Sequence, residues 1–500
     1  MSIAVSPGVY ASILDYSNYI PRLASTICAM IGSASRGPTD ERTLVTDVGS
    51  FTETFGPPSS DHPMMYAAQQ YLASGRQLWI VRVANYDVTA TGALRDGTNV
   101  ANAVAMSASS SGSWADDLSV VVAAATGTGY DISIRYQGVT VEVKRGVLIG
   151  TANSGSERYI ETQFANSLYV AFSDNGGYTT LRAGTYTLTG GDDGAPADDS
   201  DIVGTTVGNT STGMQLFANP EIVDVNMILA PGRWEKTVVN ALLALAEARG
   251  DCMAIVDPPQ GLTVQQVVDW HNGQLTGNAD YLASAINTRY GALYWPWLQV
   301  YDSYNDQELY TAPSGVAARV WAYSDSVSEP WFAPAGLVRG HPLGVLDIEH
   351  SPTLGERDYM YGQPGNNVNP FVNFIHDGIT CWGQKTLQRA STALDRINVM
   401  RMLLYARKVI STAVRYLVFE PNDPVTWLRF RQLVEPFLRN IATRRGLYDF
   451  RVVCDATTNT AYYIDQNTMR GKILLKPTKA AEIIDISFVL TPTGASFQAF

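Results

Sequence analysis

A strand, a helix and a second strand follow one another between residues 225 and 256, and this pattern constrains the fold more than any other in the 500-residue chain. Apolar runs predict strands at Val225 to Leu229 and at Met253 to Val256, with a helix from Lys236 to Arg249 between them. Two parallel strands need a crossover connection, which is usually a helix. The pattern therefore predicts a layered α/β core.

Segments before this unit extend the α/β pattern toward the N-terminus. We expect a short strand at Thr43 to Thr46, a helix at Met64 to Ala73 and a buried strand at Leu78 to Val83. Residues 85–215 differ, because they are rich in Gly, Ser, Thr and Ala. They predict a β-rich domain inserted into the α/β chain. Its expected strands include Asp131 to Tyr136, Val139 to Lys144 and Leu168 to Phe172.

The last part of the chain carries the longest helical patterns. An aromatic strand is expected at Ala292 to Val300, and an apolar stripe predicts a helix from Thr386 to Phe419. A second helix is predicted after Asp423, which can cap it, with Pro424 in its first turn. Three strands are expected to follow, at Phe450 to Cys454, Ile473 to Lys476 and Glu482 to Leu490.

Both ends of the sequence have the character of extended segments. The first 20 residues are short of charge, and the last predicted strand places Ile484, Ile486, Phe488 and Leu490 on one face. Such segments fray or add as strands to another sheet. The fold class predicted is a multidomain α/β (mixed α+β) protein with extended arms. The expected divisions are residues 1–20, 21–84, 85–215, 216–380, 381–480 and 481–500.

Charge is unevenly distributed along the chain. The net charge of −12 argues against general nucleic-acid binding, because the phosphate backbone attracts Lys and Arg. Between Lys385 and Arg451, however, 13 basic residues are accompanied by only 5 acidic ones. This local excess predicts either a solvated helix face or a surface that binds an acidic protein partner.

No group of residues predicts catalysis, a cofactor or a metal site. The turn after the first strand of the central unit contains only Gly232, without the glycine motifs that bind dinucleotides or phosphates, and no GxSxG motif is present. The five histidines are scattered. Carboxylates from Asp192 to Asp201 could bind Ca²⁺, but they lack EF-hand spacing, so a solvated turn is the simpler interpretation.

The remaining composition points to a cytoplasmic site of synthesis. Four widely spaced cysteines predict reduced, buried thiols. The first ten residues lack a basic segment followed by an apolar one, and no run of about 18 apolar residues occurs. We therefore expect neither a signal peptide nor membrane insertion.

Several short motifs are distributed along most of the chain. They include Pro7-Gly8-Val9-Tyr10, Gly190 to Gly194, Ala230-Pro231-Gly232, Asp257-Pro258-Pro259, Tyr294-Trp295-Pro296-Trp297 and Phe419-Glu420-Pro421-Asn422-Asp423. Together they resemble the contractile-tail sheath family of phages and phage-tail-like particles. The stretch from Asn85 to Thr189 carries none of these motifs.

The resemblance implies a sheath-like core of α/β layers and a structural function. Sheath proteins form stacked six-fold rings around an inner tail tube, and their ends complete sheets in neighbouring copies. It thus implies self-association, contacts with the tube, baseplate and tail terminator proteins, and a place in the virion tail after assembly in the host cytoplasm. The residues expected to exchange strands are Val5, Val9, Tyr10, Ile13, Ile484, Ile486, Phe488 and Leu490.

The basic segment gains a candidate partner from the same resemblance. We expect the tube to be contacted by Arg429, Arg431, Arg439, Arg444 and Arg445, and the β-rich insertion to point outward. Two alternatives remain: a soluble enzyme that uses the strand–helix–strand unit, and another virion structural protein such as a capsid or tube subunit.

Overall fold

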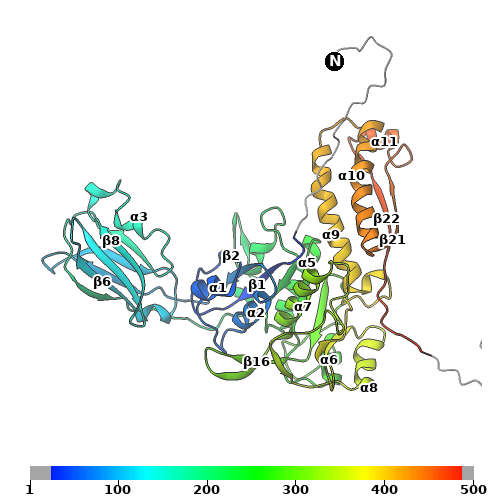
Figure 1. The fold of residues 1–500 in the computed structure, drawn as a ribbon, viewed down its shortest axis with the longest axis horizontal. Coiled ribbons are helices and arrows are strands. Elements are labelled where there is room, and N and C mark those ends of the chain that lie inside the picture. Colours follow the sequence, from blue (N-terminus) through cyan, green and yellow to red (C-terminus); the bar gives the residue numbers. More distant parts are fainter. Residues whose placement is uncertain (1–23, 487–500) are drawn as a thin grey trace, which may run out of the picture.

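The computed structural model describes residues 24–486 (Figure 1). Its largest sheet has eight strands in the order β2-β3-β1-β13-β14-β15-β19-β20. The six central strands run parallel, and the edge strands β2 and β20 are antiparallel to their neighbours. The bounds are β1 Ile27–Gly32, β2 Arg42–Val45, β3 Gln77–Arg82, β13 Met227–Leu229, β14 Met253–Val256, β15 Gly291–Trp295, β19 Val368–Phe374 and β20 Gly378–Cys381.

Helices cover both faces of this sheet, which explains why its central strands are almost wholly apolar. In β1, Cys28 and Met30 belong to one core cluster, whereas Ala29 and Ile31 belong to the other. The first cluster is completed by α1 (Val48–Phe55), α2 (Pro63–Leu72) and α7 (Pro313–Val327). The second is completed by α5 (Lys236–Arg249) and α6 (Val264–His271).

The predicted strand–helix–strand unit is confirmed. Strands β13 and β14 pair in parallel, and α5 lies between them in the chain. Gly250 ends α5 in the left-handed conformation with φ of 65°, which glycine adopts without a steric penalty.

The single strand predicted from Ala292 to Val300 is wrong, because two strands form there. Strand β15 ends at Trp295, and β16 (Leu298–Asp302) begins a separate sheet with β17 (Gln307–Thr311) and β18 (Val345–Ile348). Pro296 lies between them, and a proline has no N–H with which to continue a ladder of hydrogen bonds.

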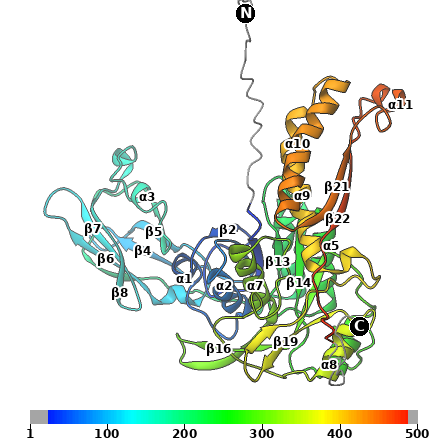
Figure 2. The same cartoon turned by 45° about the vertical axis from the view of Figure 1, so that its right-hand side comes forward.

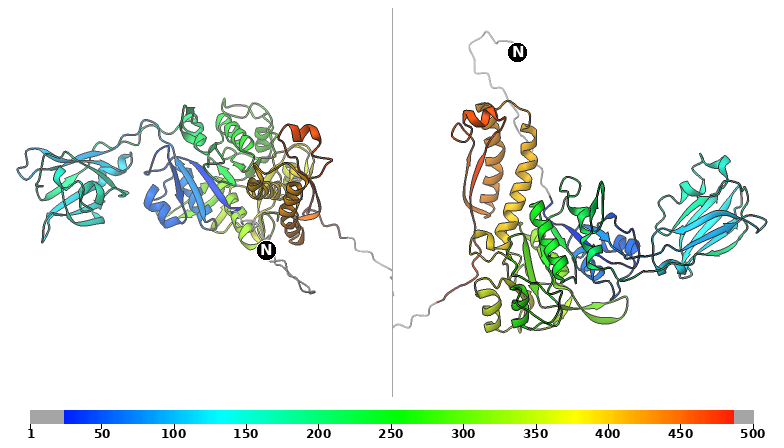
Figure 3. Two further views of the ribbon diagram at one scale, coloured as in Figure 1. Left: turned by 90° about the horizontal axis from the view of Figure 1, so that it is seen from above. Right: turned by 180° about the vertical axis from the view of Figure 1, so that it is seen from behind.

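The β-rich segment forms a separate unit that projects from the body (Figure 1 and Figure 3). It consists of a three-stranded and a four-stranded antiparallel sheet around a core of its own. The strands are β4 Thr91–Arg95, β5 Asn102–Ala108 and β9 Val170–Asp174 in the first sheet, and β10 Gly184–Thr187, β6 Leu118–Ala124, β7 Tyr130–Tyr136 and β8 Val139–Val147 in the second. The three strands predicted from the sequence correspond to β7, β8 and, two residues later, β9.

Two antiparallel segments connect this unit to the body, with bridges that join Asn85 to Ala195 and Val88 to Asp192. Asp193 in the acidic turn accepts hydrogen bonds from Ser113 N and Oγ at 2.8 and 2.6 Å. The turn therefore fixes the base of the β-rich unit.

Residues after the acidic turn return to the body. Ile202, Met214 and Phe217 pack into the core on the α5 side of the large sheet. The unit's own core extends only from Ala90 to Leu188, well short of the expected boundary at 215.

The C-terminal lobe stands upright beside the body (Figure 2). It contains α9 (Ile397–Val414), α10 (Pro424–Thr443), the strands β21 (Leu447–Val453) and β22 (Lys472–Pro477), and the short helix α11 (Ala461–Asp465). Asp423 caps α10 as predicted, accepting a hydrogen bond from Thr426 N at 2.8 Å. Trp427, Phe430, Val434 and Ile441 are buried in the core of the lobe.

Two predictions in this region are corrected. The helix expected from Thr386 begins only at Ile397, because the preceding loop satisfies its polar groups locally: Thr386 N donates to the Asp395 carbonyl and the Thr392 side chain accepts from Leu394 N. Of the strand expected from Glu482 to Leu490, residues 482–486 have no regular structure. The remainder lies outside the described residues.

Candidate inter-subunit surfaces

The β21–β22 hairpin forms a two-stranded sheet in the C-terminal lobe. Within the described part of the chain its two strands pair only with each other, so each has one edge without a strand partner (Figure 2). Val452, Phe450 and Ile473 pack toward α10 in the core of the lobe, which supports a hairpin that would be marginally stable alone. Unpaired strand edges bind extended segments through main-chain hydrogen bonds.

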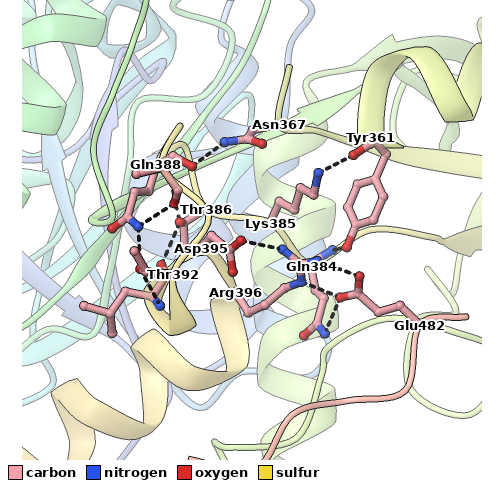
Figure 4. A network of polar contacts seen from close by, with 12 residues as sticks. Tyr361, Asn367, Gln384, Lys385, Thr386, Gln388, Thr392, Asp395, Arg396 and Glu482 are labelled. Atoms are coloured by element: carbon pink, nitrogen blue, oxygen red, sulfur yellow. Dashed lines mark hydrogen bonds and ion pairs between the residues drawn. The ribbon is translucent and has the colours of Figure 1, made fainter. Parts of the chain in front are cut away.

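The C-terminal segment leaves the body beside the start of α9 (Figure 4). The Glu482 carboxylate accepts two hydrogen bonds from Arg396, from Nε at 2.7 Å and from Nη2 at 2.9 Å. Gln384 Nε2 donates a third at 2.9 Å. We call these three residues the Glu482 clamp. Bidentate arginine–carboxylate pairs combine charge with a fixed geometry.

The surroundings hold the Glu482 clamp in place. Arg396 also pairs with Asp395 at 3.1 Å. The Lys385 backbone N–H donates to Asn369 Oδ1 at 2.6 Å, and its ammonium donates to the Tyr361 carbonyl and lies 4.6 Å from the centre of that ring. Burial lowers the pKa of Lys385. Burial also raises the pKa of Tyr361, and the nearby Glu482 charge adds to that rise.

The described chain begins at a second polar anchor. Ser25 Oγ donates to Asp325 Oδ2 at 2.7 Å, and the same oxygen accepts from Arg401 Nη2 at 2.6 Å. Asp325 lies on α7 and Arg401 on α9, and both are buried. Arg401 also lies 5.0 Å from the ring centre of Trp321. Burial raises the pKa of Asp325, and the Arg401 charge opposes that rise.

Only two of the residues expected to exchange strands lie in the described part of the chain. Ile484 is 78% exposed and Ile486 67% exposed, so both present apolar side chains to solvent. The six others, Val5, Val9, Tyr10, Ile13, Phe488 and Leu490, lie outside the described residues.

The five arginines expected at the tube differ in their exposure to solvent. Arg429, Arg439, Arg444 and Arg445 are exposed, whereas Arg431 is half-buried. Arg431 lies near Asp455, whose pKa is lowered first by hydrogen bonds from Thr457 and further by this charge.

The basic excess counted along the sequence is partly neutralised by distant residues. Arg401 pairs with Asp325, Lys408 with Asp224, and Arg444 with Glu329. These acids lie outside the segment from Lys385 to Arg451. The number of positive charges available to a partner is therefore smaller than the sequence suggests.

An apolar tip was not foreseen from the sequence. Where α9 connects to α10, Tyr416, Val418, Phe419 and Val425 are exposed, and the Phe419 side chain is fully so. Phe419 also has φ of 72°, a conformation that bulky residues rarely adopt.

The described residues offer no obvious site for chemistry. No cluster of three or more His, Cys, Asp or Glu side chains between residues 24 and 486 could hold a metal ion. No helix in the same range is long and apolar enough to cross a bilayer. The four cysteines are buried and free. Buried Asp257 accepts hydrogen bonds from Gly232 N and from Ser314 N and Oγ, so it joins elements of the core.

Comparison with known families decides the relationship suggested by the motifs. A model described as the phage tail sheath protein central domain matches residues 207–387, and one described as the phage tail sheath C-terminal domain matches residues 389–491. The two matches together cover more than half of the chain. The chain belongs to the phage tail sheath family.

Curated relatives agree with this assignment. The tail sheath protein of Vibrio phage KVP40 is 32% identical over 393 residues, which cover 74% of this chain and 56% of the relative. That of Enterobacteria phage T4 is 30% identical over 305 residues, which cover 59% of this chain and 46% of the relative. The chain thus spans about half the length of the curated sheath proteins it matches.

Solved structures of sheath proteins share the fold. The sheath tail protein from Listeria innocua aligns with a TM-score of 0.62 at 12% identity, over 91% of this chain and 95% of that one. The contracted sheath complex of the PVC extracellular contractile injection system aligns with a TM-score of 0.57 at 17% identity, over 99% and 100%. The predicted multidomain mixed α/β fold class is confirmed.

The buried His271 predicts a specific pH dependence of stability. Burial lowers its pKa to about 4, whereas an unfolded histidine titrates near about 6.5. Below about pH 6.5 the histidine becomes protonated in the unfolded chain but stays neutral in the folded chain. The free energy of unfolding therefore falls as the pH drops toward 4, by up to about 3 kcal/mol. We expect His271→Gln to remove this loss, as measured by urea unfolding at pH 7 and pH 4.5.

The control is exposed His376→Gln, which should follow the wild-type pH profile. Asp257 is present in all three proteins, so its own titration cancels in the comparison. If the free energy of unfolding of His271→Gln fell between pH 7 and pH 4.5 by as much as that of wild type, the claim that His271 is buried and neutral would be contradicted.

Proposed function

We propose that this chain is a structural subunit of a contractile tail sheath in a phage or phage-tail-like particle, and not an enzyme. Copies assemble as stacked six-fold rings around an inner tail tube. They wait in an extended, metastable arrangement until a baseplate signal, and then repack and drive the tube through a cell envelope. The observation that carries the proposal is the match of two sheath-family models to adjoining segments of one chain.

The hairpin and the exposed C-terminal segment support self-assembly. Strands β21 and β22 have edges without a strand partner among the described residues, and Ile484 and Ile486 are exposed on a segment without regular structure. An extended segment from one copy that adds to the hairpin of another would bury these side chains. Main-chain hydrogen bonds made in this way can persist while the bodies of the subunits move past one another.

The proposed mechanism is a packing switch that needs no cofactor. Contraction exchanges one set of subunit contacts for another of lower free energy, and linkage through exchanged strands makes the change cooperative. Proteins solved as contracted sheaths have the same fold as this chain, which supports the proposal.

The exposed arginines on the α10 side are the proposed contact with the tube. Arg439 and Arg445 carry no ion pair within residues 24–486, and Arg429 has only a long one, at 3.4 Å to Glu420. Exposed ion pairs contribute only about 0–1 kcal/mol each and are weakened by salt. Such weak contacts suit a sheath that must release the tube.

Self-assembly is the direct test of the proposed function. The full chain, purified and concentrated with and without the matching tube protein, should form ribbed hollow tubes or stacked rings with six-fold end views in negative-stain electron microscopy. A chain that stays monomeric in both cases would contradict the proposal and return the enzyme and other virion proteins to consideration.

Charge reversal tests the tube contact. The double variant Arg429→Glu, Arg439→Glu should reduce co-assembly with the tube protein severalfold at low salt, measured by co-sedimentation, because two attractions become repulsions. The matched control reverses Arg135 and Arg145, which are exposed on the β-rich unit. Equal co-assembly of both variants would remove these arginines from the proposed interface.

Deletion tests the proposed outward position of the β-rich unit. A short Gly-Ser linker can replace residues 89–191, because Val88 N donates to the Asp192 carbonyl at 2.9 Å and keeps the ends close. The shortened chain should keep its fold and still polymerise, since the unit has a separate core. A folded variant that fails to polymerise would place this unit inside the lattice.

A further inference from the structure

Both ends of the described chain are anchored at the start of one helix. Arg401, in the second turn of α9, pairs with Asp325, which also binds Ser25. Arg396, the residue before α9, binds Glu482. Five residues of helix correspond to a rise of about 7.5 Å, so the two arginines lie close together along α9.

We propose that Arg396 and Glu482 are positioning residues that direct the C-terminal segment toward a neighbouring copy, and that α9 couples this segment to the N-terminal one. The inference rests on the proposed function, because it concerns how the exchanged segments leave their own subunit. It assigns to the Glu482 clamp a role in assembly that is distinct from a role in folding.

The clamp is the last point at which the described chain holds this segment. Between residues 479 and 486, Glu482 makes the side-chain hydrogen bonds and ion pairs that join the segment to the rest of residues 24–486. Thr478 N still binds the Gly446 carbonyl, whereas Ile483 and Ile484 are almost wholly exposed. The Glu482 carboxylate therefore fixes the point from which residues 483–486 leave the body.

The two anchors differ in burial, and this gives them different functions. The Arg401 and Asp325 side chains are only 6% and 3% exposed, so removing either would leave a buried charge and disturb the fold. Arg396 and Glu482 are 28% and 25% exposed. A partly exposed pair contributes little to the stability of the fold. It does restrict the segment before binding, so less conformational entropy is lost when the segment binds a neighbouring copy.

In this proposal, α9 links the two points at which the terminal segments leave the subunit. If each end of the chain binds a different neighbour, a movement of α9 moves both departure points together. The clamp then keeps the C-terminal segment in register with the lobe whose hairpin receives strands from other copies. Loss of the clamp should leave a folded subunit whose C-terminal segment samples many directions.

The test uses Glu482→Ala in the full chain, with Asp485→Ala as the matched control. Asp485 is exposed in the same segment and carries the same charge. Urea unfolding should give the wild-type midpoint for Asp485→Ala and a slightly lower one for Glu482→Ala, because the buried Gln384 amide loses its acceptor. Spin labels at Ile484→Cys and Gln432→Cys, both exposed positions, should give a narrow distance distribution that becomes broad with Glu482→Ala and stays narrow with Asp485→Ala.

Assembly is then measured without labels. Glu482→Ala should raise the concentration needed for sheath formation by about tenfold, while Asp485→Ala stays within about twofold. Arg396→Ala should have the same effect as Glu482→Ala, and the double variant should add little to either, as expected for two residues that act as a pair.

Each other outcome overturns a defined part of the account. An unchanged distance distribution in Glu482→Ala contradicts the clamp, whatever the assembly shows. A broad distribution with normal assembly contradicts its role toward neighbours. Wild-type chains that never form a sheath, even with the tube protein, contradict the proposed function and with it the assembly role, while the labels still report on the clamp itself.

Discussion

Helix α9 packs into two hydrophobic cores, and the arrangement of the whole molecule depends on this. Ile397, Met400 and Leu404 belong to the core beneath the large sheet, whereas Val399 and Met402 belong to the core of the C-terminal lobe. The lobe is therefore fixed to the α/β body by one continuous helix and not by a loop. The Arg401–Asp325 pair adds a buried ion pair, at 2.6 Å, to this junction.

The chain combines a well-buried core with weakly held surface segments, and this combination suits a subunit that changes its contacts. The large sheet is buried on both faces and provides a rigid body. Proposed contacts between copies lie instead in weakly held parts: the hairpin edges and the exposed apolar segment at Ile484 and Ile486. Such contacts can be remade without unfolding the body. The β-rich unit has a core of its own and is joined to the body by two segments.

Local patterns were sufficient to predict much of the fold. The β13–α5–β14 unit and the cap of α10 follow from periodicity and residue preferences that act within a few residues. The same approach failed where polar side chains or a proline decided the outcome: Pro296 divides an apolar run into two strands, and Thr392 delays the start of α9. Pro296 and Thr392 are both visible in the sequence, but a prediction based on apolar periodicity alone does not take them into account.

The candidate surfaces were less predictable, because they depend on pairs that are remote in sequence. Glu482 is 86 residues from Arg396, and Asp325 is 76 residues from Arg401. Nothing local to either residue indicates the partner. For the same reason, the sequence overstates the charge of the basic segment, because its acidic partners are remote in sequence. The exposed position of Phe419 was also not predicted.

The most direct test of the central claim is a cryo-electron microscopy structure of the sheath assembled from this chain. The account predicts that extended segments from neighbouring copies lie beside β21 and β22 with main-chain hydrogen bonds to them, and that Glu482 remains on Arg396. A sheath in which every hairpin stays two-stranded, with both ends of each chain folded onto their own subunit, would contradict it.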